Sequence, residues 1–164
     1  MVIRDVAASD MQQIADIYNH YIHTTAISFE EHSVSAEQMR ERVQAVLDIA
    51  LPWLVAELDG KVIGYAYAGQ WKARSAYRYT VEPSIYLDHS ATGKGAGRRL
   101  YSALFEQLKA LGISNAVGSI ALPNPSSIGL HESLGFKKVG EFSNIGMKFG
   151  KKITVGYWQL ELSA

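Results

Sequence analysis

A glycine-rich segment over residues 92–100, TGKGAGRRL, is the part of the chain best suited to binding a ligand. Gly93, Gly95 and Gly97 carry no side chain, so a ligand could approach the backbone closely there. The segment follows an alternating strand pattern and opens an amphipathic helix pattern with leucines at 100, 104, 108 and 111. N–H groups exposed at the positive end of a helix form an anion site, which suits a pyrophosphate.

Two common phosphate-binding loops do not fit this segment. A nucleotide P-loop needs a lysine followed by serine or threonine, whereas Lys94 is followed by Gly95. A dinucleotide fingerprint starting at Gly93 would need glycine at position 98, which is Arg98, and an acidic residue about 20 residues later. The phosphate-binding loop pattern that remains is x-x-x-Gly-x-Gly/Ala. A glycine-rich helix start without a ligand is the alternative interpretation.

A second element lies downstream of the loop. Residues 124–136, NPSSIGLHESLGF, have the pattern of a short helix that Gly135 ends before another strand. Asn124 is a typical helix cap, and His131 titrates near neutrality and could exchange a proton. Local hydrogen bonding within the helix is the plainer explanation of both residues.

The rest of the chain alternates between strand and helix patterns. Ser35 and Gln38 form a capping box that predicts one helix start, Ser9 predicts another, and Asp59-Gly60 predicts a tight hairpin. Strands are expected at residues 2–6, 53–58, 61–71, 78–87, 116–122, 136–142 and 154–162. This order predicts a single α+β domain over residues 1–164, with a central mixed sheet covered by helices.

Composition is that of an ordinary globular protein. Of 164 residues, 48% are hydrophobic and 20% charged, and 16 basic residues balance 16 acidic ones. The chain therefore has no net positive charge that would attract it to nucleic acid or an anionic membrane. The longest apolar run, 49–56, is too short to cross a bilayer, and the N-terminus lacks a secretion-signal pattern, so we expect a cytoplasmic protein. Cysteine is absent, and His20 and His23 lack further ligands at a suitable spacing, so no metal is expected.

The loop, the strand at 116–122 and the Asn…Leu-His-x-x-x-Gly-Phe element together resemble the GNAT superfamily of N-acetyltransferases. Further blocks look like its phosphinothricin N-acetyltransferase group: IYNHY at 17–21, ISFEE at 27–31, PWLVAE at 52–57, GYAYAG at 64–69, YTVE at 79–82 and KFG at 148–150. The resemblance implies the GNAT fold, with a mostly antiparallel sheet splayed at the coenzyme site and flanked by helices. It also implies acetyl transfer from acetyl-CoA to the α-amine of a small amino-acid analogue such as phosphinothricin or methionine sulfoximine. Because the chain has no cysteine nucleophile, we expect direct attack in a ternary complex. Alternatives are another acceptor amine, on a protein N-terminus, a polyamine or an antibiotic, and a coenzyme A-binding sensor without activity.

Residues that match the family's coenzyme site fall into three segments. The strand before the loop would carry the pantetheine arm, the loop would hold the pyrophosphate, and the next helix would contact the coenzyme. The implied residues are Ile85, Tyr86, Leu87, Thr92, Gly93, Lys94, Gly95, Ala96, Gly97, Arg98, Asn124 and Ser127. At Thr92 an arginine or glutamine is usual in the family, so we expect looser phosphate anchoring, partly offset by Lys94. Pro83 fits a local break in the strand ladder, or it is an ordinary edge-strand proline.

The resemblance also assigns catalytic roles to Glu82 and His131. A substrate ammonium with a pKa of about 10 must lose a proton, and Glu82 could relay it through water as a general base. Glu82 could instead only pair with the ammonium. His131 takes the place where many GNAT enzymes keep a tyrosine as the acid for the leaving thiolate.

The acceptor pocket is expected on two loops and the strand that follows. Its implied residues are Phe29, Glu30, Trp71, Lys72, Arg74, Tyr77 and Thr80. Arg74 suits a carboxylate or phosphinate, because a guanidinium fork binds two oxygens in one plane. A solvated Lys-Ala-Arg loop is the alternative. In related proteins the basic turn at 148–152 lies near the substrate mouth and the dimer partner, and solvent exposure is the alternative. Relatives of this group are often dimers, so we expect a homodimer.

Overall fold

Seven strands form one sheet in the computed structural model, which describes residues 1–162. The spatial order is β1-β2-β3-β4-β5-β7-β6, and neighbours are antiparallel except β4 with β5. The strands are β1 (Val2–Asp5), β2 (Trp53–Leu58), β3 (Lys61–Gln70), β4 (Thr80–Leu87), β5 (Asn115–Ala121), β6 (Lys137–Lys148) and β7 (Lys151–Glu161). The helices are α1 (Met11–Thr24), α2 (Ala36–Asp48), α3 (Ala96–Ala110) and α4 (Pro125–Ser133). The α+β prediction is confirmed. In the described part of the chain, no helix has the length and apolar character needed to span a membrane.

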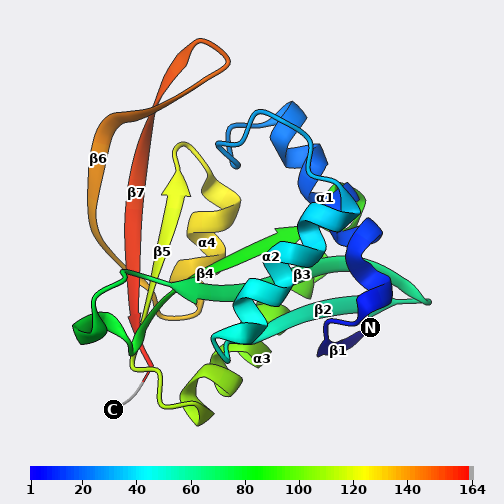
Figure 1. Ribbon diagram of the computed structural model, residues 1–164. Coiled ribbons are helices and arrows are strands. Elements are labelled where there is room, and N and C mark those ends of the chain that lie inside the picture. The colour runs from blue at the N-terminus through cyan, green and yellow to red at the C-terminus, as the bar shows by residue number, and fades with distance from the viewer. Residues whose placement is uncertain (163–164) are drawn as a thin grey trace.

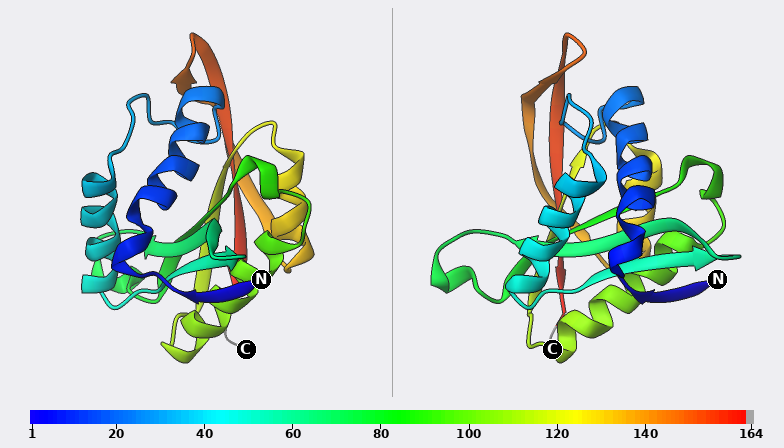
Figure 2. Two further views of the ribbon diagram at one scale, coloured as in Figure 1. Left: turned by 90° about the vertical axis from the view of Figure 1, so that its right-hand side faces the viewer. Right: turned by 45° about the vertical axis from the view of Figure 1, so that its right-hand side comes forward.

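Helices cover both faces of the sheet. α1 and α2 lie on one face, and α3 and α4 on the other (Figures 1 and 2). Successive residues of β2 point to opposite faces, so Trp53 and Val55 join the apolar cluster of α1 and α2. Leu54 and Ala56 join the cluster of α3 instead. Burial on both faces explains why the first four residues of this strand, 53–56, form a continuous apolar run in the sequence.

The sheet opens between β4 and β5. Only two residue pairs join these strands, and the last of them is Val81 with Ala116. Beyond it β4 continues along β3 and β5 continues along β7, so the two strands diverge (Figure 1). Pro83, which has no N–H to give to a ladder, lies just past the last pair. The predicted splay is confirmed, and it leaves a gap between the carboxyl-terminal halves of both strands.

The last two strands form a hairpin arm that is longer than predicted. β6 continues beyond the expected end at Phe142 to Lys148, and β7 begins before the expected start at Thr154. The pairing register shifts between Phe142 and Gly146, which interrupts the alternation that a regular strand would show. The turn that follows includes Phe149 at a φ of 53°.

The predicted cap is correct at α2 and wrong at α1. Gln38 N–H donates to Ser35 Oγ at 3.1 Å and Ser35 N–H to Gln38 Oε1 at 2.9 Å, as a capping box requires. Ser9 instead lies inside a short 3-10 turn, and Asp10 takes the N-cap position of α1. Both oxygens of the buried Asp10 accept from Arg4 at 2.9 Å, so a partly buried ion pair, which spacing did not reveal, lies at this helix start.

Candidate functional site

A cleft of about 390 Å³ opens beside the diverging strands. Its walls come from the end of α1, the end of β4, the glycine-rich loop and the start of α4. The lining residues are Tyr21, Ile27, Ile85, Tyr86, Leu87, Thr92, Gly93, Gly95, Gly97, Arg98, Asn124, Ser126, Ser127 and Leu130. Every residue predicted to contact the coenzyme therefore lines this cleft, except Lys94 and Ala96.

The glycine-rich loop leaves backbone N–H groups without helical acceptors at the start of α3. Gly93 and Gly95 have φ values of 77° and 79°, a left-handed conformation that glycine adopts without strain. The first hydrogen bond of the helix runs from Arg99 N–H to the Gly95 carbonyl at 3.2 Å. The N–H groups of residues 96–98 therefore have no helical acceptor. At the positive end of the helix dipole, this arrangement fits a diphosphate.

Two contacts bring α4 against this loop. A Cβ at Gly97 would lie 3.3 Å from Leu130 Cδ2, so glycine permits a close approach of the two helices. Arg98 Nη1 donates to Ser133 Oγ at 3.0 Å, which ties its guanidinium to α4 at the border of the cleft. The loop thus presents a positive side chain beside its backbone N–H groups.

A main-chain acceptor sets the tautomer of the buried His131. Its Nδ1 lies 2.7 Å from the Ser127 carbonyl oxygen, and a carbonyl can only accept, so Nδ1 carries the hydrogen. The Nε2 atom of the neutral ring therefore presents a lone pair, on the side of Gly118. Burial lowers the pKa of His131, and the Ser127 hydrogen bond opposes that shift. The imidazole is mainly uncharged at neutral pH.

A second cavity, of about 70 Å³, adjoins the cleft at the gap between β4 and β5. The two cavities share Ile27, Ile85, Tyr86, Asn124 and Ser127. His131 and Tyr101 also line the smaller one, and their rings meet edge to face with centroids 5.3 Å apart. Asn124 Oδ1 accepts from Ser127 N–H at 3.2 Å, so Asn124 is the helix cap that its sequence position indicates. Together the cavities connect the glycine-rich loop to the splayed strands, as an elongated ligand requires.

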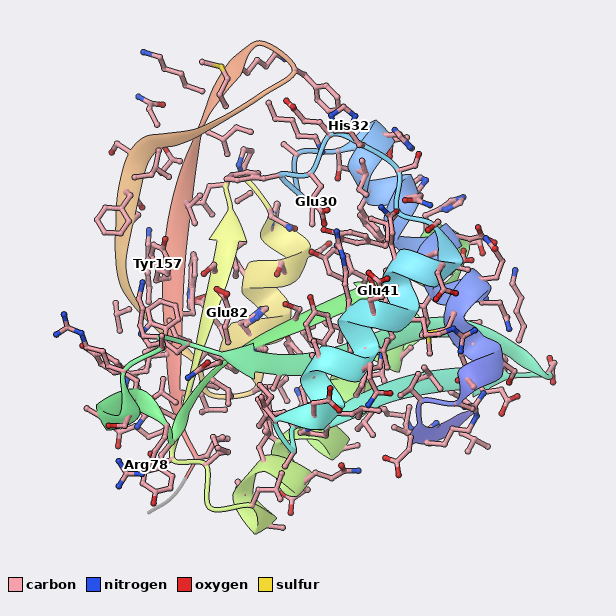
Figure 3. The ribbon with its side chains drawn as sticks, viewed as in Figure 1. Glu30, His32, Glu41, Arg78, Glu82 and Tyr157 are labelled. Carbon is pink, nitrogen blue, oxygen red and sulfur yellow. The ribbon has the colours of Figure 1, made fainter. Side chains whose placement is uncertain are left out.

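Glu82 lies at this gap, on the sheet face that carries α1 and α2. Ser119 on β5 donates from Oγ to Glu82 Oε1 at 2.8 Å. Ser119 is in register with Tyr157 on β7, and Tyr157 meets Trp71 edge to face with centroids 6.3 Å apart. Figure 3 shows Glu82 beside the diverging strands, with Tyr157 on β7. We call these four residues, a carboxylate, a hydroxyl and two aromatic rings, the Glu82 wall. Sequence reasoning did not predict Ser119 or Tyr157.

Comparison with known proteins identifies the family. The protein-family model described as an acetyltransferase (GNAT) domain matches residues 3–155 of this chain. The chain belongs to the GNAT acetyltransferase family. This chain is 41% identical over 157 residues to phosphinothricin N-acetyltransferase of Streptomyces viridochromogenes. That alignment covers 96% of this chain and 85% of the relative. This chain is also 36% identical over 162 residues to L-methionine sulfoximine/L-methionine sulfone acetyltransferase of Salmonella typhimurium, with 99% and 95% covered.

A solved structure supports both the fold described above and acetyl-CoA as the coenzyme. The GNAT superfamily phosphinothricin acetyltransferase of Sinorhizobium meliloti, crystallised in complex with acetyl-CoA, matches with a TM-score of 0.96 and 37% identity. The match covers 99% of this chain and 88% of that one. GNAT acetyltransferases use acetyl-CoA as co-substrate, and the cleft with its loop N–H groups and Arg98 fits the anionic end of that molecule.

In this GNAT enzyme, Glu30 is already engaged by other side chains. Its two oxygens each accept from Arg42 at 2.7 Å, and the Tyr18 hydroxyl donates to one of them. The hydrogen bonds from Arg42 hold the pKa of Glu30 below its usual value. Glu30, predicted to bind the acceptor, thus orders the loop after α1.

The β6–β7 arm of the enzyme packs against the same loop. A Cβ at Gly146 would lie 2.5 Å from Phe29 Cε2, so the Phe29 ring rests on bare backbone. Lys148 is only 2% exposed and donates from Nζ to the Ser28 carbonyl. Burial lowers the pKa of Lys148. Arm and loop therefore form one continuous surface that includes the predicted acceptor residue Phe29.

The other predicted acceptor residues lie on or beside the loop between β3 and β4. Lys72 Nζ lies 5.0 Å from the centroid of Trp71, at the rim of the Glu82 wall. Arg74 and Tyr77 are exposed, and the Arg74 side chain forms no hydrogen bond or ion pair with any described residue. Thr80 lines a separate cavity of about 330 Å³. The fold thus brings Trp71 to the Glu82 wall with Lys72 at its rim, and it leaves Arg74 and Tyr77 farther along the loop. Thr80 is the first residue of β4, two residues before Glu82.

Proposed function

We propose that this chain acetylates the α-amine of a small amino-acid analogue of the phosphinothricin or methionine sulfoximine type. Relatives named for those two acceptors match nearly its whole length, at 41% and 36% identity. The observation that carries the proposal is the position of Glu82, a carboxylate at the gap where the coenzyme cleft meets the Glu82 wall.

In the proposed reaction, the groups of the site act in coenzyme binding, deprotonation of the acceptor and acetyl transfer. The loop N–H groups and Arg98 bind the diphosphate, and the gap between β4 and β5 receives the thioester arm. Glu82 accepts a proton from the acceptor ammonium, directly or through water, which frees the nitrogen lone pair. That lone pair forms the new C–N bond with the acetyl carbon, the C–S electron pair leaves with sulfur, and the nitrogen releases its second proton to water as the amide forms.

His131 is the proposed proton donor to the departing sulfur. Because its Nδ1–H is bonded to the Ser127 carbonyl, it can give a proton to the cavity only from Nε2, when the ring is charged. Burial lowers the pKa of His131 and so disfavours that charged form. We therefore expect the contribution of His131 to the rate to decline as pH rises through this lowered pKa.

Cations on the loop between β3 and β4 would bind the anionic end of the acceptor. Lys72 lies over the Trp71 ring at the rim of the wall. Arg74 is exposed on the same loop and has no ion pair among the described residues, so its guanidinium is available to a carboxylate or phosphinate. An acceptor held this way would carry its amine toward Glu82.

The proposal includes a homodimer built through the arm. Five apolar side chains of β6 and its turn are 57–61% exposed: Val139, Phe142, Ile145, Met147 and Phe149. Exposed apolar side chains gathered on one hairpin arm are typical of an interaction site, and a second copy of the chain would cover them. Light scattering after size exclusion should give a dimer for the native chain and a monomer for Ile145→Lys. A monomeric native chain would remove the dimer from the proposal.

Replacing Glu82 with glutamine tests the function. The control is Glu41→Gln on α2, an exposed carboxylate that Figure 3 shows away from Glu82. Thiol release from acetyl-CoA with methionine sulfoximine or phosphinothricin should show kcat reduced about 10²-fold in Glu82→Gln, since general-base catalysis contributes at least that much. Calorimetric affinity for acetyl-CoA should be unchanged. A native chain that binds acetyl-CoA but acetylates polyamines faster than these acceptors would contradict the proposed substrate class.

A further inference from the structure

We propose that Ser119 is a positioning residue for Glu82, holding one carboxylate oxygen so that the other faces the acceptor amine. This inference rests on the proposed base role of Glu82. Ser119 does not itself contact the reacting atoms in this scheme. It acts through the orientation of the carboxylate.

The splay of the sheet creates the need for such a restraint. Glu82 follows Val81, whose pairing with Ala116 is the last contact of the β4–β5 ladder. From Glu82 onward, β5 no longer fixes the neighbouring backbone of β4. The 2.8 Å hydrogen bond from Ser119 Oγ crosses the gap at this point. Within residues 1–162 it is the one side-chain hydrogen bond that Glu82 makes.

The donor stands on a rigid support. β5 pairs with β7 without interruption from Asn115 to Ala121, and Ser119 lies opposite Tyr157 in that ladder. Its neighbours Gly118 and Ile120 are buried whereas Ser119 is exposed, so strand alternation directs the hydroxyl to the face that carries Glu82. The backbone of β5 therefore determines where the hydroxyl stands, and the carboxylate adapts to it.

The opposite side of Glu82 is open. Its partner on β3 is Gly69, which has no side chain, and a Cβ added there would meet nothing within 4 Å. The carboxylate is thus restrained from the β5 side through Oε1, and the β3 residue paired with Glu82 has no side chain to restrain it from the other side. A flexible glutamate populates several rotamers, and a restraint on one oxygen reduces that freedom before the amine arrives.

The experiment compares Ser119→Ala, Ser119→Thr, Glu82→Gln and the double variant Ser119→Ala with Glu82→Gln. Ser102→Ala, an exposed serine of α3 outside the cleft, is the matched control. Ser119→Ala should lower kcat about tenfold, the low end for losing a hydrogen bond to a charged acceptor. Acetyl-CoA affinity and Tm should equal those of Ser102→Ala. Ser119→Thr keeps the hydroxyl and should restore most of kcat.

The double variant separates positioning from an independent structural effect. In the Glu82→Gln background, Ser119→Ala should cause no further loss, because the carboxylate that it orients is gone. An equal fractional loss in both backgrounds, or full kcat in Ser119→Ala while Glu82→Gln is impaired, overturns the positioning role and leaves the base role intact. Normal kcat in Glu82→Gln removes the base role and this inference with it.

Discussion

The Gly118→Ala substitution should create a steric clash with His131 and destabilise the protein. A Cβ at this position would lie 3.0 Å from His131 Nε2 and 3.1 Å from Cδ2, shorter than the 3.4 Å at which ordinary contact begins. The ring cannot move aside freely, because Nδ1 is hydrogen-bonded to the Ser127 carbonyl oxygen at 2.7 Å. The Phe136 ring also packs edge to face against it, with ring centroids 4.9 Å apart. Overpacking of a filled core costs about 1–3 kcal/mol. For a domain of this size, that free energy lowers Tm by roughly 2–12 °C.

Gly129→Ala is the control with the opposite expected sign. This glycine lies in α4 two residues before His131, and a Cβ there would meet nothing within 4 Å. Alanine in a helix is favoured over glycine by about 0.5–1 kcal/mol, so this variant should be more stable than the native chain. Urea unfolding followed by tryptophan fluorescence measures both changes, and thiol release should show lower kcat only for Gly118→Ala. A Gly118→Ala protein of native stability would show that β5 does not confine the imidazole.

Two further predictions concern pH and the arm. Burial lowers the pKa of His131 from its ordinary 6.5, so its contribution to the free energy of unfolding is fully present above pH 6.5 and is lost as pH falls through the lowered pKa. The stability difference between the native chain and His131→Gln should therefore shrink between pH 8 and pH 5 in urea titrations, and a constant difference would contradict the assignment. Gly146→Ala should displace the Phe29 ring, which its Cβ would approach to 2.5 Å, and raise KM for the acceptor while acetyl-CoA affinity stays native. A raised coenzyme Kd with unchanged acceptor KM would instead place this contact on the coenzyme side.

Local chemistry explains which parts of the site were predictable from sequence. The glycine-rich loop is contiguous in the chain, and free N–H groups follow from glycine and a helix start in any context. Asn124 caps α4 for the same local reason. The splay could be predicted through the family resemblance, with Pro83 as a local indication, because a residue without an N–H cannot continue a ladder.

Contacts between distant segments explain what the sequence did not reveal. Ser119 is 37 residues from Glu82, and strand alternation indicates only that it faces away from the core, not which side chain it meets. Glu30 was expected at the acceptor, yet Arg42, twelve residues later on α2, binds both of its oxygens. Nothing in either segment indicates that pairing, which depends on how the loop after α1 folds back over α2.

The divergence of β4 and β5 links the two halves of the proposed reaction. His131 packs on the α3 side of the sheet, where its neighbours are Tyr101 and Phe136, whereas Glu82 lies on the side of α1 and α2. In a continuous sheet the backbone ladder would separate them. The gap removes the ladder at this level and puts a cavity in its place, lined by His131 and by Ser119, the hydrogen-bond donor to Glu82. A thioester in that gap would therefore have a carboxylate on one face and an imidazole on the other, so the same break in pairing that admits the coenzyme arm also lets both groups reach it.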